Sequence, residues 1–224
     1  MAGTGTLYIV ATPIGNLGDI TFRAIDVLKN VDAILAEDTR VTKKLLMHYE
    51  IDKHIVSYHH HSPDSRKEEI LQMLVGGKDL ALVTDAGTPG ISDPGNELID
   101  YILEKEPSAK TVPIPGASAL VTTLSVSGFR ADKFIFLGFL PKKKRQKLFT
   151  WLKEAKMTFA FFDSPHRLHK TLQDLKGYFG GEVRIVIARE LTKMHETLYR
   201  GLLSDIEKSL PKKIKGEVVV VVEN

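Results

Sequence analysis

Residues 84–95, with the sequence TDAGTPGISDPG, are the segment of this chain that most strongly indicates a ligand site. They follow the apolar run 80–83, typical of a buried parallel strand, and precede segment 96–103, which predicts an amphipathic helix. A strand-to-helix turn needs only ~2–6 residues, so the extra glycine and proline predict a rigid loop whose backbone approaches a ligand. Open α/β sheets bind ligands at this end of their strands. The alternative is an elaborate structural turn, and in either case Asp93 and Pro94 fit a helix N-cap and first helical residue.

Two carboxylates and an arginine follow a second predicted strand, residues 33–36. Glu37 or Asp38 has the chemistry to hold and deprotonate a substrate hydroxyl, and Arg40 has the chemistry to bind a phosphate. These three are the candidate catalytic residues. The alternative is structural, because Asp38 or Thr39 can cap the helix predicted over 39–49 while Arg40 pairs with the cap.

Two further loops narrow the class of cofactor. Residues 12–19 follow the first predicted strand, 7–11, but they lack the GxGxxG spacing of a dinucleotide fold, and no Gly-Lys-Ser/Thr occurs in the chain. Segment 115–119, PGASA, brings a glycine to the start of a predicted helix, where amides and the Ser118 hydroxyl can bind a carboxylate. A plain helix start is the alternative there. Together the loops favour a small polar cofactor held largely by backbone, and they count against NAD or a nucleoside triphosphate.

The consecutive histidines His59, His60 and His61 do not predict a metal site. Neighbouring residues of a strand point to opposite faces, so the three imidazoles cannot easily converge. The chain also has no cysteine, which excludes thiolate ligands and disulfides. We therefore expect no metal, and the better interpretation is that His59 or His61 lines an acceptor pocket.

Lys142, Lys143, Lys144 and Arg145 form the densest positive run. Such a run is usually a solvated helix start, but with an RNA substrate it becomes a candidate phosphate-binding patch. The net charge of +3 over 224 residues favours a nucleic-acid partner only weakly. The longest apolar run, 218–222, is far shorter than the ~20 residues that cross a bilayer, and no targeting segment is evident. We therefore expect no membrane partner and a cytoplasmic location.

The elements that position these residues alternate between strand and helix through the first half of the chain. Strands are predicted at 7–11, 33–36, 55–58 and 80–83. Ser65 and Glu68 indicate a capping box for the helix that follows the third strand. This order predicts a parallel sheet with helices on its faces.

The pattern changes in the second half of the chain. Strand-like segments occur at 134–139, 158–162, 183–188, 196–200 and 217–222, and helices separate only some of them. The segment 183–200 has no room for a helical crossover, so it predicts an antiparallel hairpin. We therefore predict an α/β protein with a parallel-sheet domain at 1–114 and a mixed-sheet domain at 115–224.

Six segments occur in an order that matches one family. They are LYIVATPIGNL at 7–17, AEDTR at 36–40, the loop 84–95, PGASA at 115–119, SPHR at 164–167 and RELTK at 189–193. With these motifs the chain, from residue 5 to 224, resembles the 16S rRNA (cytidine-2'-O)-methyltransferases of the tetrapyrrole methylase superfamily, the class III methyltransferases that use S-adenosylmethionine (SAM). The resemblance implies a two-domain fold with SAM in a cleft between the domains. It also implies 2'-O-methylation of a cytidine ribose in the decoding region of 16S ribosomal RNA.

The resemblance implies a set of cofactor contacts, carried over position by position. They are Ile14, Asp85, Ala86, Gly87, Thr88, Ile91, Ser118, Ala119, Asp163 and Leu191. It further implies 16S rRNA, free or within the 30S subunit, as substrate, and a homodimer. No metal is needed, because the thioether that leaves a sulfonium donor is neutral.

Two departures from the family pattern stand out. Asp163 replaces the usual glutamate before SPHR, and residues 58–62, YHHHS, replace a segment that tends toward His-Glu-His-Asn. The nearest alternative is another enzyme of the superfamily, which would methylate a tetrapyrrole of the precorrin or uroporphyrinogen type or a protein side chain. A further alternative is a non-catalytic protein that binds SAM or RNA. The motifs AEDTR and SPHR and the basic run favour the ribosomal RNA group.

Overall fold

A computed structural model describes residues 3–224, and these form two compact units. The first unit extends to Ser118 and the second begins at Ala119. The domain boundary expected after residue 114 lies in the same connection, between strand β5 and helix α5. No helix within the described residues is long and apolar enough to cross a membrane.

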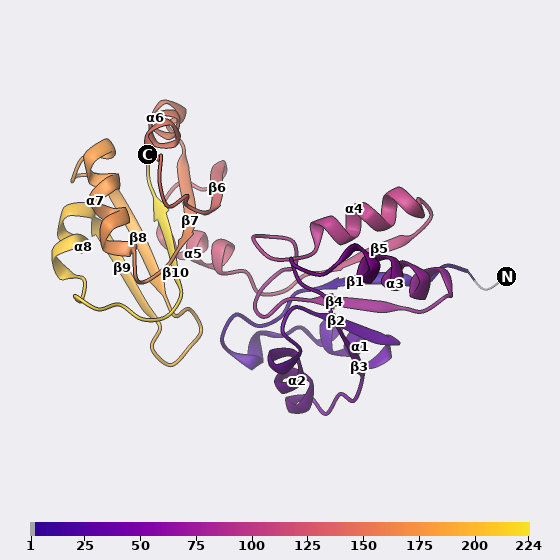
Figure 1. Ribbon diagram of the computed structural model, residues 1–224. Coiled ribbons are helices and arrows are strands. Elements are labelled where there is room, and N and C mark those ends of the chain that lie inside the picture. Colours follow the sequence, from indigo (N-terminus) through magenta and orange to yellow (C-terminus); the bar gives the residue numbers. More distant parts are fainter. Residues whose placement is uncertain (1–2) are drawn as a thin grey trace. The chain divides into compact units, whose positions relative to one another are not determined.

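The first unit is built on a five-stranded sheet of parallel neighbours in the order β3-β2-β4-β1-β5 (Figure 1). Its strands are β1 (Thr6–Val10), β2 (Ala33–Ala36), β3 (His54–Ser57), β4 (Leu80–Val83) and β5 (Lys110–Ile114). Its helices are η1, a 3-10 helix (Leu17–Asp19), α1 (Phe22–Asn30), α2 (Thr39–His48), α3 (Asp64–Val75) and α4 (Asn96–Lys105). The predicted parallel sheet is therefore confirmed.

Helices cover both faces of this sheet and produce two apolar clusters. Leu74 of α3 and Leu98 of α4 pack in one cluster, and Leu28 of α1 and Leu46 of α2 pack in the other. All residues of β2 and β4 are buried, as expected for parallel strands covered on both sides. Because the strands are parallel, the carboxyl ends of β1, β2, β4 and β5 share one edge of the sheet. The loops predicted to hold a ligand leave the sheet at that edge.

The second unit contains a five-stranded mixed sheet in the order β6-β7-β10-β8-β9. Its strands are β6 (Phe134–Phe139), β7 (Thr158–Asp163), β8 (Arg184–Arg189), β9 (Thr197–Leu202) and β10 (Val218–Val222). Its helices are α5 (Ala119–Ser127), α6 (Gln146–Ala155), α7 (Leu168–Phe179) and α8 (Leu203–Ser209). Strands β6 and β7 are parallel and the other neighbours are antiparallel, so the predicted mixed sheet and the β8–β9 hairpin are confirmed.

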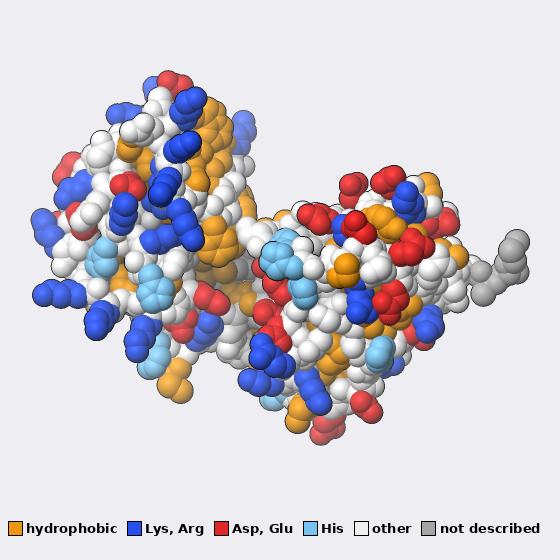
Figure 2. Space-filling view, viewed as in Figure 1, with side chains coloured by type: hydrophobic (Ala, Val, Ile, Leu, Met, Phe, Trp, Pro, Cys, Tyr) orange, Lys and Arg blue, Asp and Glu red, His pale blue; other side chains and the backbone are white. Residues whose placement is uncertain are grey.

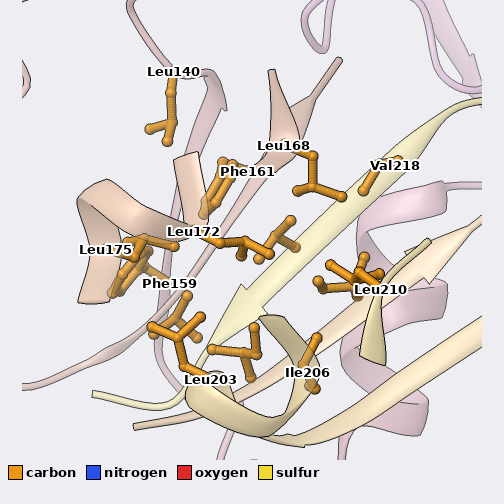
Figure 3. Close-up of a cluster of buried hydrophobic side chains, with 14 of the residues drawn as sticks. Leu140, Phe159, Phe161, Leu168, Leu172, Leu175, Leu203, Ile206, Leu210 and Val218 are labelled. Carbon is orange, nitrogen blue, oxygen red and sulfur yellow. The ribbon is translucent and has the colours of Figure 1, made fainter. Parts of the chain in front are cut away.

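Successive side chains of the central strands point to opposite faces of the sheet, so the apolar residues of the second unit form a cluster on each face. Phe159 and Phe161 of β7 belong to the cluster that α6, α7 and α8 cover, shown in Figure 3, whereas Ala160 belongs to the cluster under α5. This division follows from the two-residue period of a strand. The continuous valine run of β10 is buried on both faces, which explains its composition.

Two helix starts differ from the expectation. Helix α4 begins at Asn96 with Gly95 as N-cap, so Asp93 is not the cap residue. The loop before it closes on itself instead, because the Asn96 amide donates to the Gly90 carbonyl at 2.8 Å. Helix α3 begins at Asp64 with Pro63 as N-cap and no side-chain cap bond, so the capping box from Ser65 is also wrong.

The ring of Phe149 on α6 should carry much of the stability of the second unit. It is fully buried, and its centroid lies 5.3 Å from that of Tyr178 and 6.0 Å from that of Phe179. We expect Phe149→Ala to lower the free energy of unfolding by about 3–5 kcal/mol, because the cavity cannot fully collapse. Trp151→Ala is the control on the same helix and should cost less than about half as much, since that side chain is 50% exposed. Equal losses in denaturant unfolding would contradict this assignment of the core.

Candidate functional site

Backbone and side-chain hydrogen bonds hold the loops at the carboxyl edge of the first sheet together. Thr12 and Gly87 form an isolated antiparallel bridge, with N–H to O distances of 2.9 Å and 3.1 Å. The Thr12 hydroxyl also donates to the Thr84 carbonyl at 3.0 Å. The loop after β1 is therefore joined directly to the loop after β4.

The loop 84–95 needs glycine at specific positions. Gly87 has φ +85° and Gly90 has φ +83°, a conformation that L side chains rarely adopt. A Cβ at Gly90 would lie 2.4 Å from Oδ1 of Asn96, the side chain whose amide nitrogen closes the loop. A Cβ at Gly87 would lie 3.6 Å from the Ile14 side chain, which is buried. Two of the expected cofactor residues, Ile14 and Gly87, thus lie side by side in the structure.

The remaining expected cofactor residues of this unit occupy the same edge. Asp85, Ala86, Thr88 and Ile91 lie in the loop after β4, and Ile91 is 49% exposed. The connection after β5 approaches closely as well, because a Cβ on Gly116 would lie 2.9 Å from that of Ala11. Ser118 follows in this connection and is half-buried.

Glu37 and Asp85 form a carboxylate pair across the ends of β2 and β4. Burial, and secondarily the negative charge of Asp85, raises the pKa of Glu37, although an Asp85 backbone N–H bond opposes this. Burial likewise raises the pKa of Asp85, with a bond from the Asp38 N–H at 3.1 Å acting in the opposite direction. Two proton-accepting groups therefore lie at the edge where the sheet is expected to bind its ligand.

Asp38 has the structural role that was the alternative to catalysis, because it caps helix α2 and pairs with Arg40. Its Oδ1 accepts from the Arg40 backbone N–H at 2.8 Å, which caps α2. The Arg40 guanidinium also donates to both carboxylate oxygens, at 3.0 Å and 2.6 Å. The side-chain hydrogen bond from Arg40 lowers the Asp38 pKa to about 2. Of the two candidate bases, only Glu37 makes no ion pair within the described residues.

The histidine segment lies near this pair but forms no metal site. Positive charge on His60 and His59 would lower the pKa of Glu37, so both imidazoles are within electrostatic reach of it. The Ser62 hydroxyl accepts from the His59 backbone N–H at 2.9 Å, and His59 Nδ1 accepts from the His61 N–H at 3.2 Å. Across residues 3–224, no three His, Cys, Asp or Glu side chains are placed to hold a metal ion.

The expected cofactor residues of the second unit differ in their surroundings. Ala119 is the first residue of α5, and Leu191 is buried between two residues with positive φ, Glu190 and Thr192. Asp163 ends β7 with a fully buried side chain. Its Oδ1 accepts from the Ser164 N–H and from the Arg167 guanidinium, whereas its Oδ2 has no partner among the described residues.

Arg145 does not belong to the exposed positive run. Its guanidinium is buried and donates to the Pro141 carbonyl at 2.6 Å, and to Thr171 and Asp174 at 3.1 Å each. Thr171 and Asp174 lie far along the chain, and no local pattern indicates them. Lys142, Lys143 and Lys144 remain exposed just before α6. The expectation that Arg145 binds phosphate therefore does not fit its position.

Sequence reasoning also missed Thr84. Its carbonyl accepts from Thr12, but its own buried hydroxyl has no partner within residues 3–224. Unsatisfied buried hydroxyls are rare in native structures. The residue type alone gave no signal of this, because a threonine at a strand end is ordinary.

The chain matches a family model over most of its length. The model of the tetrapyrrole (corrin/porphyrin) methylases matches residues 6–207. A protein of Synechocystis sp. named Ribosomal RNA small subunit methyltransferase I is 50% identical over 89% of this chain and 71% of its own length. Its namesakes from Halalkalibacterium halodurans and Bacillus subtilis are each 47% identical over 98% of this chain, covering 76% and 75% of their own lengths.

Solved structures with low sequence identity share the fold. The methyltransferase CobJ has a TM-score of 0.73 at 18% identity, covering 99% of this chain and 95% of its own. A diphthine synthase has a TM-score of 0.69 at 14% identity, covering 97% and 90%. At this identity the likeness concerns the fold alone, and it agrees with the predicted two-domain α/β architecture.

The raised pKa of Glu37 gives a prediction for stability against pH. The folded protein binds this proton more tightly than the unfolded chain, whose glutamates titrate near 4.5, so stability falls as pH rises through and above that value. Glu37→Gln removes the charge and keeps an oxygen that accepts from the Asp85 N–H. We expect a higher melting temperature than wild type at neutral pH and no difference at about pH 4.

Glu154→Gln is the control for this measurement, because Glu154 is exposed and makes no ion pair in the described chain. It should leave the melting temperature unchanged at both pH values. A Glu37→Gln variant that melts at or below the wild-type temperature at neutral pH would contradict the assignment of an electrostatically strained carboxylate.

Proposed function

The chain belongs to the tetrapyrrole (corrin/porphyrin) methylase family, and on that premise we propose that it is a SAM-dependent methyltransferase acting on 16S ribosomal RNA. We propose the 2'-oxygen of a cytidine ribose in the decoding region as the acceptor. One observation carries the proposal: relatives 43–50% identical over 89% or more of this chain bear the name Ribosomal RNA small subunit methyltransferase I. The cobalt precorrin-4 methyltransferase and the uroporphyrin III C-methyltransferase that share the fold are only 17% and 14% identical.

The chemistry of the first unit's loops fits SAM. Glu37 and Asp85 are carboxylates with raised pKa, and the nearby guanidinium of Arg40 is paired with Asp38. A cationic ligand relieves such an arrangement. The Thr84 hydroxyl, which has no partner among the described residues, and the glycine backbone of 84–95 supply further polar contacts. When bound, SAM supplies an electrophilic methyl group on a sulfonium.

The cofactor contacts that we propose come from both units. In the first they are Ile14, Asp85, Ala86, Gly87, Thr88, Ile91 and Ser118, and in the second they are Ala119, Asp163 and Leu191. The buried Asp163 Oδ2, which has no partner among the described residues, is available to accept a hydrogen bond from a ligand. A buried acceptor without a donor lowers the stability of the fold, and a ligand that donates a hydrogen bond to it removes that cost.

We assign the proton transfer to Glu37. A ribose hydroxyl is a weak acid, and its proton must leave as the oxygen is methylated. The raised pKa of Glu37 brings its carboxylate closer to the operating pH, which favours a general base. Asp38 has a pKa of about 2 and caps α2, so it is the weaker base. Its pairing with Arg40 fixes the start of α2.

The remaining parts of the proposal follow from the substrate. An enzyme of bacterial type that modifies ribosomal RNA works in the cytoplasm, with free 16S rRNA or the 30S subunit as partner. We further propose that it acts as a homodimer, as the family resemblance implies. Exposed Lys142, Lys143 and Lys144 fit contacts to the phosphate backbone, and Arg145 supports them from below the surface.

Labelled transfer tests the acceptor. Purified 30S subunits or deproteinised 16S rRNA, incubated with the protein and methyl-labelled SAM, should yield label in the RNA, on a ribose after nuclease digestion. Label in a uroporphyrinogen offered in a parallel reaction, with none in RNA, would instead establish the tetrapyrrole alternative. Calorimetry with SAM serves as the control for binding, and no heat of binding by folded protein would refute the proposal.

Single-turnover rates test the assignment of the base. We expect Glu37→Gln to lower the rate of methyl transfer about 10²–10⁴-fold, with SAM affinity largely kept, because a general base contributes that much. Asp38→Asn preserves an N-cap oxygen and should lower the rate far less. Full activity in both variants would show that neither carboxylate of the AEDTR segment takes part in the reaction.

A further inference from the structure

The lysines of the second unit differ in whether a carboxylate pairs with them. Lys176 of α7 pairs with Glu207 at 2.7 Å, and Lys208 of α8 pairs with Asp205 at 3.4 Å. Lysines of two loops, at 141–145 and 211–216, make no ion pair within the described chain. They are Lys142, Lys143 and Lys144 in the first loop and Lys212, Lys213 and Lys215 in the second, and all are exposed.

The first loop is held from beneath by two arginines. Arg145 donates to the Pro141 carbonyl and is neutralised by Asp174. Arg167, which precedes α7, donates to the Leu140 carbonyl at 2.9 Å. The backbone that carries the first group of lysines is thus fixed at its start and at its end.

The second loop is anchored to the same helix start. The imidazole Nε2 of His169 lies 2.9 Å from the Pro211 carbonyl. Arg189 donates to the Lys215 carbonyl at 2.7 Å, and Ile214 is buried beneath the loop. Arg167 and His169, two residues apart, therefore tie both lysine loops to the beginning of α7.

Figure 2 shows the charge distribution that results. Lys and Arg side chains gather on the viewed face of the second unit, with His side chains among them and few acidic groups. Asp205 and Glu207, the carboxylates that pair with Lys208 and Lys176, belong to α8 and not to these loops. Unpaired like charges on fixed loops repel one another in the free protein, and a polyanion removes that cost.

We propose that the two lysine loops and the start of α7 form one binding surface for the phosphate backbone of RNA, with Lys212 and Lys213 as contacts alongside Lys143 and Lys144. The proposal rests on the proposed function, which supplies RNA as the substrate class. Lysine is a compact point charge that suits phosphates and does not demand the planar geometry of base recognition. Loops fixed before binding lose little conformational freedom when the RNA arrives.

The test measures RNA affinity against salt. A fluorescein-labelled single-stranded RNA is titrated with the full-length protein by anisotropy at several salt concentrations between ~50 and ~200 mM. We expect K212E/K213E to weaken binding about tenfold or more and to reduce the slope of log K against log salt by about 1.4, since each lost single-strand phosphate contact removes ~0.7. K143E/K144E should behave alike, and the combined variant should lose both contributions.

K105E/K110E is the matched control, because it makes the same change of charge at exposed lysines of the first unit. It should leave the salt slope at its wild-type value. SAM binding by calorimetry should be unchanged in every variant, which shows that each is folded. Wild-type slope and affinity in K212E/K213E, or equal loss in K105E/K110E, would overturn the proposed surface.

Two further outcomes separate this proposal from the proposed function. RNA binding that depends on both lysine loops, with no methyl transfer to RNA by wild type, would refute the proposed function and keep the surface. Co-sedimentation with phosphatidylserine vesicles tests the other polyanion that such lysines attract. Vesicle binding lost in K212E/K213E, with RNA binding unaffected, would overturn the proposal in favour of a membrane surface.

Discussion

The candidate site of the first unit depends on the backbone pairing of Thr12 with Gly87. Two hydrogen bonds, at 2.9 Å and 3.1 Å, fix the loop after β4 against the loop after β1. The pairing requires φ +85° at residue 87, where a side chain would add strain, so the residue there is glycine for a conformational reason. Asp85 lies two residues before this pairing and is thereby placed to accept from the Asp38 N–H at the end of β2. One backbone contact thus brings three strand ends together.

The cost of this arrangement is electrostatic. Burial, and secondarily the negative charge of Asp85, raises the pKa of Glu37, and the guanidinium of Arg40 is already bound to Asp38. A chain selected for stability alone gains by neutralising one of the carboxylates. Carboxylates with a raised pKa cluster at functional sites, which agrees with the role proposed for Glu37.

Much of the fold could be predicted from the sequence because its signals are local. Apolar runs of four or five residues marked β2, β4 and β10, and the short spacing between 183 and 200 left only a hairpin. The helix starts could not be predicted in the same way. Asp93 has the right residue type for a cap, but the turn closes through Asn96 and Gly90, and the helix starts after Gly95. Burial of Arg145 was equally inaccessible, because Thr171 and Asp174 reach it only after the chain has folded.

The burial of Arg145 separates its role from that of the three exposed lysines before it in the run KKKR, a difference that composition does not reveal. A buried guanidinium keeps several donors in a fixed planar geometry, and here it serves a carbonyl, a hydroxyl and a carboxylate at once. The three preceding lysines stand at the amino end of α6, where the helix dipole disfavours cations. Helix stability therefore gives no reason for their presence. The arginine maintains the loop, whereas the three lysines are exposed and make no ion pair within the described chain, which agrees with the phosphate contacts proposed for them.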